Sequence, residues 1–138
     1  MSTEVKITTS TIAGRTCASS GSRWEPILGY SRAVRSGNQI AVTGSVGISA
    51  DGTYSASLGE QTRRSLVIVR AAVEALGGKI EHVIRTRMYV TDVTKWEEVA
   101  KVHGEVFANI RPATTIVEVT RLIDKDAQIE IEADAVVA

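Results

Sequence analysis

The sequence has little cysteine, few aromatic residues and no excess of charge of either sign. Its single cysteine, Cys17, cannot form a disulfide within the chain, and its two histidines do not form a C-x-x-C or H-x-x-x-H metal pattern. Aromatic residues make up 4% of the 138 residues, and 16 Lys and Arg balance 16 Asp and Glu. Nucleic-acid binders usually show a basic face and aromatic side chains for stacking. We therefore expect no metal and no nucleic acid.

Long hydrophobic runs are also missing. No apolar stretch approaches the ~20 residues that span a bilayer, and the start of the chain, Met1 to Glu4, lacks the basic and apolar regions of a secretory signal. We therefore expect a cytoplasmic protein with no membrane association. Hydrophobic residues at 43% and charged residues at 23% are close to the globular average. The length predicts a single domain over residues 1–138.

Local patterns in the first half predict a hairpin and a helix. Met1 to Gly29 has little periodicity, so we expect a strand near Val5 to Thr9 followed by loop, in which Cys17 lies. The turn signal at Gly37-Asn38 predicts a β-hairpin over Ser31 to Val46. After a second turn at residues 50–53, Ser57 is expected to cap a helix from about Leu58 to Leu76. Its apolar face carries Leu66, Val69, Val73 and Leu76, and Gly77-Gly78 ends it.

The second half predicts a strand, a helix and two further strands. Alternation over Ile80 to Thr91 places Ile84 on the same side as Thr86. Thr94 and Glu97 form a capping-box pattern for a helix that ends near Ala108. We expect Trp96 to pack against the core from this helix.

The last strands are expected over Thr114 to Thr120 and Gln128 to Val137. Together the predicted elements make an α+β fold, a mixed β-sheet with two helices packed on one face. Glu118, Glu130 and Glu132 then lie on the other face, beside β-branched residues. Such a face suits an oligomer interface with polar clefts.

Several motifs carry a specific resemblance. They are Gly29-Tyr30, Thr43-Gly44, the segment PATTIVEV at residues 112–119 and the segment QIEIEA at residues 128–133. Together they resemble the RidA/YjgF family, also called the endoribonuclease L-PSP family. The resemblance implies a bacillus chorismate mutase-like fold, a homotrimeric barrel and a small-molecule site in each cleft between subunits. Deaminase members hydrolyse 2-imino or 2-enamino acids to 2-oxo acids and ammonia without a cofactor.

The resemblance assigns roles to individual residues. Glu130 matches the glutamate that positions a water molecule, which requires a carboxylate within hydrogen-bond reach. Tyr30 matches the tyrosine that lines the cleft, and Thr43 and Gly44 match the turn beside the substrate. Trp24 and Glu25, shortly before Tyr30, could cover the cleft.

The chain departs from the deaminase pattern at the position after Pro-Ala. Thr114 stands where deaminases have an arginine that binds the substrate carboxylate, and Ile116 stands where many members have a cysteine. A hydroxyl brings no charge, and charge-assisted hydrogen bonds are roughly twice as strong as neutral ones. Arg111 and Arg32 are the candidates for the missing cation. His82 and His103 are interpreted as surface or packing residues.

The sequence is compatible with two functions. The first is a trimeric protein that binds a small 2-imino, enamino or 2-oxo acid, or a related amide, and deaminates it with a water oriented by Glu130. The second is a non-catalytic binding or regulatory protein, which Thr114 favours and Glu130 opposes. A third interpretation, ribonuclease action, comes only from the older family name. The neutral charge balance and the absence of a paired-histidine pattern in the sequence oppose it.

Overall fold

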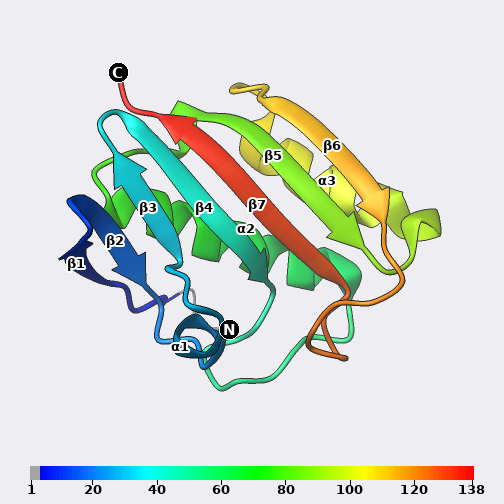
Figure 1. The fold of residues 1–138 in the computed structure, drawn as a ribbon. Helices are drawn as coiled ribbons and strands as arrows, with labels where there is room; N and C mark the ends of the chain where they lie inside the picture. The colour runs from blue at the N-terminus through cyan, green and yellow to red at the C-terminus, as the bar shows by residue number, and fades with distance from the viewer. Residues whose placement is uncertain (1–3) are drawn as a thin grey trace.

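The computed structural model describes residues 4–138 as one mixed sheet with helices (Figure 1). Met1 to Thr3, which begin both the expected N-terminal region and the expected domain, lie outside the described residues. In chain order the elements are β1 Thr8–Ile12, β2 Arg15–Ser19, α1 Trp24–Leu28, β3 Ala33–Ser36, β4 Gln39–Val46, α2 Leu58–Ala75, η1 Ile80–His82, β5 Val83–Val90, η2 Val93–Lys95, α3 Trp96–Phe107, β6 Ala113–Glu118 and β7 Ile129–Val136.

The last strand of the chain lies inside the sheet. The seven strands follow the order β1-β2-β3-β4-β7-β5-β6, and β5 and β6 form the parallel pair. β7 pairs with β4 on one side and with β5 on the other, as Figure 1 shows. In this register Glu130 lies opposite Val46 of β4 and Tyr89 of β5. The C-terminal motif therefore meets residues from both halves of the chain.

The core lies between the sheet and the helices α2 and α3, which cover the same face (Figure 1). Ile129 and Ile131 of β7 are fully buried there, and so are Val69 and Val73 of α2. The expected apolar face of α2 and the alternation of β7 are both confirmed. The mixed sheet with two helices on one face is confirmed as well.

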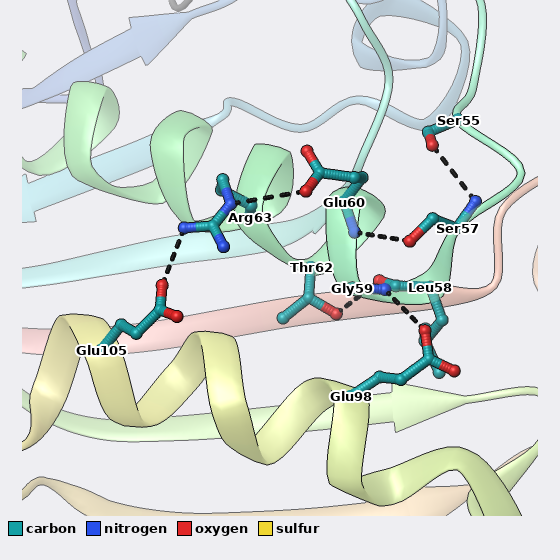
Figure 2. A network of polar contacts seen from close by, with 9 residues as sticks. All are labelled: Ser55, Ser57, Leu58, Gly59, Glu60, Thr62, Arg63, Glu98 and Glu105. Carbon is teal, nitrogen blue, oxygen red and sulfur yellow. Dashed lines mark hydrogen bonds and ion pairs between the residues drawn. The ribbon is translucent and has the colours of Figure 1, made fainter.

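Polar contacts fix the start of α2 and join it to α3, as Figure 2 shows. The Ser57 hydroxyl accepts a hydrogen bond from the Glu60 backbone N–H at 3.2 Å, so the predicted N-cap is confirmed. Arg63 forms an ion pair with Glu105 of α3 at 2.9 Å. At the other end, Gly77 has the left-handed φ of 85° that was expected to stop the helix.

The N-terminal region contains more structure than predicted. The expected strand near Val5 to Thr9 begins later, at Thr8, and it pairs with a second strand where a loop was expected. Ala13 and Gly14 connect the two with φ values of 53° and 76°, the geometry of a tight hairpin turn. Because β1 is exposed along its length, it carries no apolar alternation that a sequence pattern could reveal. Cys17 is buried in β2 and does not lie in a loop.

Two details of the second half also differ. The expected strand from Ile80 begins as the helix η1, and a register shift between Val83 and Arg85 turns Ile84 outward to 54% exposure. The predicted capping box is wrong, because Asp92 accepts the hydrogen bond from the Thr94 N–H and caps η2. Trp96 is 52% exposed, so its expected packing role is wrong too.

In residues 4–138 no helix is both long enough and apolar enough to cross a membrane.

Two glycines test how tightly the helices pack on the sheet. A Cβ added to Gly47, just after β4, would lie 2.3 Å from the Gln61 carbonyl oxygen of α2. We expect Gly47→Ala to lower the free energy of unfolding by about 1–3 kcal/mol, because the helix backbone must shift. Gly104→Ala is the control, because a Cβ there meets nothing within 4 Å. It should stabilise α3 by about 0.5–1 kcal/mol. Urea unfolding measures both, and an unaffected Gly47→Ala variant would contradict this packing.

Candidate functional site

A cavity of about 990 Å³ lies where β4, β7 and α1 meet. It belongs to the upper part of the range of roughly 300–1,000 Å³ found for small-molecule sites. Among the predicted site residues, the cavity is lined by Tyr30, Arg32, Thr43, Gly44 and Glu130. One chain thus brings together most of the residues that the sequence indicated.

Glu130 lies against the backbone of β4. A Cβ added to Gly44 would lie 2.8 Å from Glu130 Cδ, so a larger residue at position 44 would displace the carboxylate from its present position. The register of β4 against β7 shifts between Val42 and Ser45, which places Thr43 and Gly44 in an irregular stretch opposite this carboxylate. Burial raises the pKa of Glu130, and nearby Glu132 raises it further, while Arg32 acts in the opposite direction. Glu130 therefore holds a proton more readily than an exposed glutamate.

Arg32 is a buried cation of the cavity, at 6% exposure, and Arg64 of α2, which also lines the cavity, is buried too. The Arg32 guanidinium donates to the Gly44 carbonyl at 2.8 Å and to the Tyr30 hydroxyl at 3.2 Å, and it lies 5.5 Å from the centroid of the Tyr30 ring. It also donates to the hydroxyls of Ser20 and Ser45. No ion pair within 4.0 Å among residues 4–138 includes Arg32. Because buried charges are usually paired, this charge can serve an anionic ligand.

A buried carboxylate holds the loop that orients Arg32. Glu25 Oε2 accepts hydrogen bonds from the backbone N–H and hydroxyl of Ser20 and from the Ser22 N–H, at 3.0–3.2 Å. The Ser20 hydroxyl in turn accepts from Arg32 Nε at 3.2 Å. Glu25 is not among the residues that line the cavity, so its expected role as a cover is wrong, whereas Trp24 does line the cavity.

The remaining predicted site residues lie elsewhere in the chain. Thr114 is on the edge strand β6, where its hydroxyl is 2.9 Å from that of Thr86, and Thr86 is 2.9 Å from His103 Nε2. Ile116, two residues further on, packs against the core. Arg111 is exposed, and its N–H donates to the Phe107 carbonyl at the end of α3. None of Thr114, Ile116 and Arg111 lines the cavity.

Sequence reasoning missed several members of the site. Tyr89 and Glu132 line the cavity, and the Tyr89 hydroxyl donates to Glu132 Oε1 at 2.8 Å. This hydrogen bond is the main cause that raises the pKa of Tyr89. The alternation of the strands indicated their faces, but only the pairing of β5 with β7 brings them together. His103 was interpreted as a surface or packing residue, and its hydrogen bond to Thr86 had no sequence signal.

The described part of the chain, residues 4–138, contains no group of three or more His, Cys, Asp or Glu side chains that could hold a metal ion.

The fold and the cavity define a class of α+β proteins with a mixed sheet, helices on one sheet face and a concave polar site beside the central strands. Comparison with known proteins gives the family. The family model described as Endoribonuclease L-PSP matches residues 20–137. The chain therefore belongs to this family, the RidA/YjgF family.

Relatives and solved structures of the family are similar over most of their length. A crystal structure of a YjgF/YER057c/UK114 family member from Mycobacterium tuberculosis is 45% identical, with a TM-score of 0.83, and the match covers 89% of this chain and 99% of that one. A protein of Escherichia coli K12 named 2-iminobutanoate/2-iminopropanoate deaminase is 36% identical over 78% of this chain and 86% of its own length. TdcF of E. coli, crystallised with bound serine, is 29% identical, with a TM-score of 0.74 and coverage of 79% and 88%.

The raised pKa of Glu130 predicts a pH-dependent effect of Glu130→Gln on stability. A carboxyl whose pKa is raised by folding favours the folded state at low pH and loses that contribution as the pH rises through the raised pKa. At neutral pH Glu130→Gln removes the cost of a buried charge, so it should raise the midpoint of thermal unfolding. The gain should shrink as the pH falls through the raised pKa, and it should be lost below about 4.3, the ordinary glutamate pKa.

Thermal unfolding between acidic and neutral pH measures this difference. The control is Glu81→Gln, at an exposed glutamate of η1, which should show no such trend. A Glu130→Gln variant that is less stable than the unmodified protein at neutral pH would contradict the assignment.

Proposed function

We propose that the protein binds a small 2-imino, 2-enamino or 2-oxo acid in this cavity and hydrolyses the imine form to a 2-oxo acid and ammonia. The observation that carries the proposal is the presence of Glu130, Arg32 and Tyr30 in one cavity. The reaction requires a group that activates water and a group that binds the substrate carboxylate. A carboxylate of raised pKa can do the first, and a buried cation beside it can do the second. The deaminase name of the E. coli relative supports the reaction class.

In the proposed reaction Glu130 acts as general base and then as general acid. Its carboxylate accepts a proton from water while the water oxygen bonds to C2 of the imine, and the C=N π pair moves to nitrogen. Glu130 then returns a proton to this nitrogen. Glu130 then takes the hydroxyl proton of the tetrahedral intermediate and passes it to the amino nitrogen. The oxygen forms the C=O bond as the C–N bond breaks, and nitrogen leaves with that electron pair as ammonia. A raised pKa suits both transfers, because a group of intermediate acidity exchanges protons in either direction.

Arg32 is the proposed anchor for the substrate carboxylate. The guanidinium lines the cavity and is held in position by Gly44, Ser20 and Tyr30. Arg111, the other candidate, is exposed at the end of α3 and does not line the cavity. The hydrogen bonds of Arg32 engage Nε, Nη1 and one N–H of Nη2, so the guanidinium offers a substrate carboxylate its positive charge and the second N–H of Nη2. This charge would take the place of the arginine that Thr114 replaces.

We also propose the homotrimer that the family resemblance implies. In it, β6 of a neighbouring subunit would bring Thr114 and Ile116 to the cavity of the next chain. Two observations support this arrangement. Neither residue lines the cavity of its own chain, and β6 is a strand at the edge of the sheet. Sedimentation equilibrium should give three times the 14.8 kDa mass of one chain, and a monomer would contradict the proposal.

Kinetics with enzymatically generated 2-aminoacrylate test the proposed roles. We expect Glu130→Gln to lower kcat by about 10²- to 10⁴-fold, the usual contribution of general acid–base catalysis. Arg32→Met should raise KM by about 10- to 100-fold, because hydrogen bonds to a charged group are lost. Ammonia release measures both. Arg70→Met, at an exposed arginine of α2, is the control and should leave both constants unchanged. Normal activity of the Glu130→Gln variant would contradict the proposed reaction.

The alternative is a protein of the same fold that binds a small acid without chemistry. One observation favours it: Thr114 offers a neutral hydroxyl, already 2.9 Å from the Thr86 hydroxyl, where deaminases have a cation. An inert unmodified protein together with an active Thr114→Arg variant would support this alternative. Turnover of any 2-imino acid that Glu130→Gln abolishes would exclude it.

A further inference from the structure

The cavity is lined by two chemically different sets of residues. The polar set, Arg32, Tyr30 and Glu130, is the proposed reaction site. The second set, here called the apolar rim, consists of Trp24 and Leu28 of α1, Ile48 after β4 and Ile123 between β6 and β7. A ligand attached by its carboxylate to Arg32 therefore has apolar surface available within the same cavity.

The size of the cavity exceeds what a short acid needs. At about 990 Å³ it is as large as sites that take drug-sized ligands, which occupy roughly 300–1,000 Å³. An acid of three or four carbon atoms would fill only a small part of this volume, and β6 of a neighbouring subunit would take up another part in the proposed trimer. A ligand with a large apolar side chain would fill more of it and would remove apolar surface from water.

The apolar rim offers much surface that is still accessible. Leu28 is 60% exposed and Ile123 is 69% exposed. Leu28 lies on the same helix as Ile27, which is 68% exposed but does not line the cavity. This neighbour provides a matched comparison for any effect of Leu28.

Polar contacts join the segments that carry the apolar rim. The Arg23 guanidinium stacks on the Trp24 ring at 4.4 Å and pairs with Asp124 at 3.4 Å, and Asp124 directly follows Ile123. The Tyr54 hydroxyl donates to the other oxygen of Asp124 at 2.7 Å. Three segments that are distant in sequence are thus tied together beside the cavity. These contacts are made by residues next to Trp24 and Ile123, and they join the two segments of the apolar rim.

We propose that the apolar rim binds the side chain of the ligand, so that the protein prefers 2-imino acids with a branched aliphatic or aromatic side chain over the small imines of alanine or serine. This inference rests on the proposed function, because it takes the carboxylate to lie at Arg32. It adds to that function a preference for the side chain of the substrate, which neither Glu130 nor Arg32 determines.

Competing imines test the preference. An L-amino acid oxidase generates the 2-imino acids of leucine, phenylalanine and alanine in the assay, and the rate of imine hydrolysis gives kcat/KM for each. We expect the leucine and phenylalanine imines to exceed the alanine imine by at least about 10-fold, since even one methylene in an apolar pocket changes kcat/KM by roughly 10- to 200-fold. Equal values for all three would overturn the inference while the proposed function stands.

Variants of the apolar rim locate the preference. Leu28→Asn and Ile123→Asn should each reduce the ratio of leucine imine to alanine imine by about 10-fold, whereas Leu28→Met should keep the ratio. Ile27→Asn is the control and should keep both the ratio and the activity. If Leu28→Asn and Ile27→Asn instead both dissociate the assembly and leave the ratio unchanged, a second copy of the chain covers this surface, and the inference is overturned.

Binding of 2-oxo acids separates the two proposals. Calorimetry with 4-methyl-2-oxopentanoate, phenylpyruvate and pyruvate needs no turnover. Binding of the two larger acids at least about 10-fold more tightly than pyruvate supports the apolar rim even if every imine is inert, a result that would remove only the proposed reaction. Equal affinities for the three 2-oxo acids would overturn the proposed role of the apolar rim, whether or not the protein hydrolyses imines.

Discussion

The alternation of side chains along β7 is the constraint on which the rest of the structure depends. Ile129 and Ile131 point to the helices and are fully buried, while Glu130 and Glu132 point to the other face and line the cavity. A slip of one residue would exchange the two sets and place carboxylates in the core. Because β7 lies between β4 and β5, the same register that builds the core also positions the candidate site.

Burial of Glu130 affects both the stability of the fold and the proposed chemistry of the site. A Cβ at position 44 would contact the carboxylate at 2.8 Å, so the absence of a side chain at Gly44 lets the carboxylate lie in this position. Arg32 acts to lower the pKa of Glu130, but burial dominates and the pKa is raised. The fold thus retains a carboxylate in a position that a glutamine would fill at less cost in free energy. Such a cost is common where a titratable group has a chemical role.

The sequence predicted the parts of the fold that have strong periodicity. The helix from Leu58 and the strand that contains Glu130 were confirmed because each buries a regular apolar stripe. The hairpin of β1 and β2 was missed because its first strand is exposed and polar. For the site, the family motif indicated Glu130 and Gly44, which the structure brings together. It could not indicate Tyr89, which reaches the cavity only through the pairing of β5 with β7.

The position of Thr114 bears on the proposal that this residue replaces the arginine of the deaminases. Thr114 is on the edge strand, hydrogen-bonded to Thr86, and in one chain it does not line the cavity that contains Glu130. Arg32 supplies a buried guanidinium in that cavity instead, and no carboxylate among residues 4–138 pairs with it within 4.0 Å. A cation within the same chain as Glu130 would fix the substrate carboxylate relative to the general base without a contribution from a neighbour. The proposed site therefore differs from the deaminase pattern in where its charge lies, and it still contains a cation.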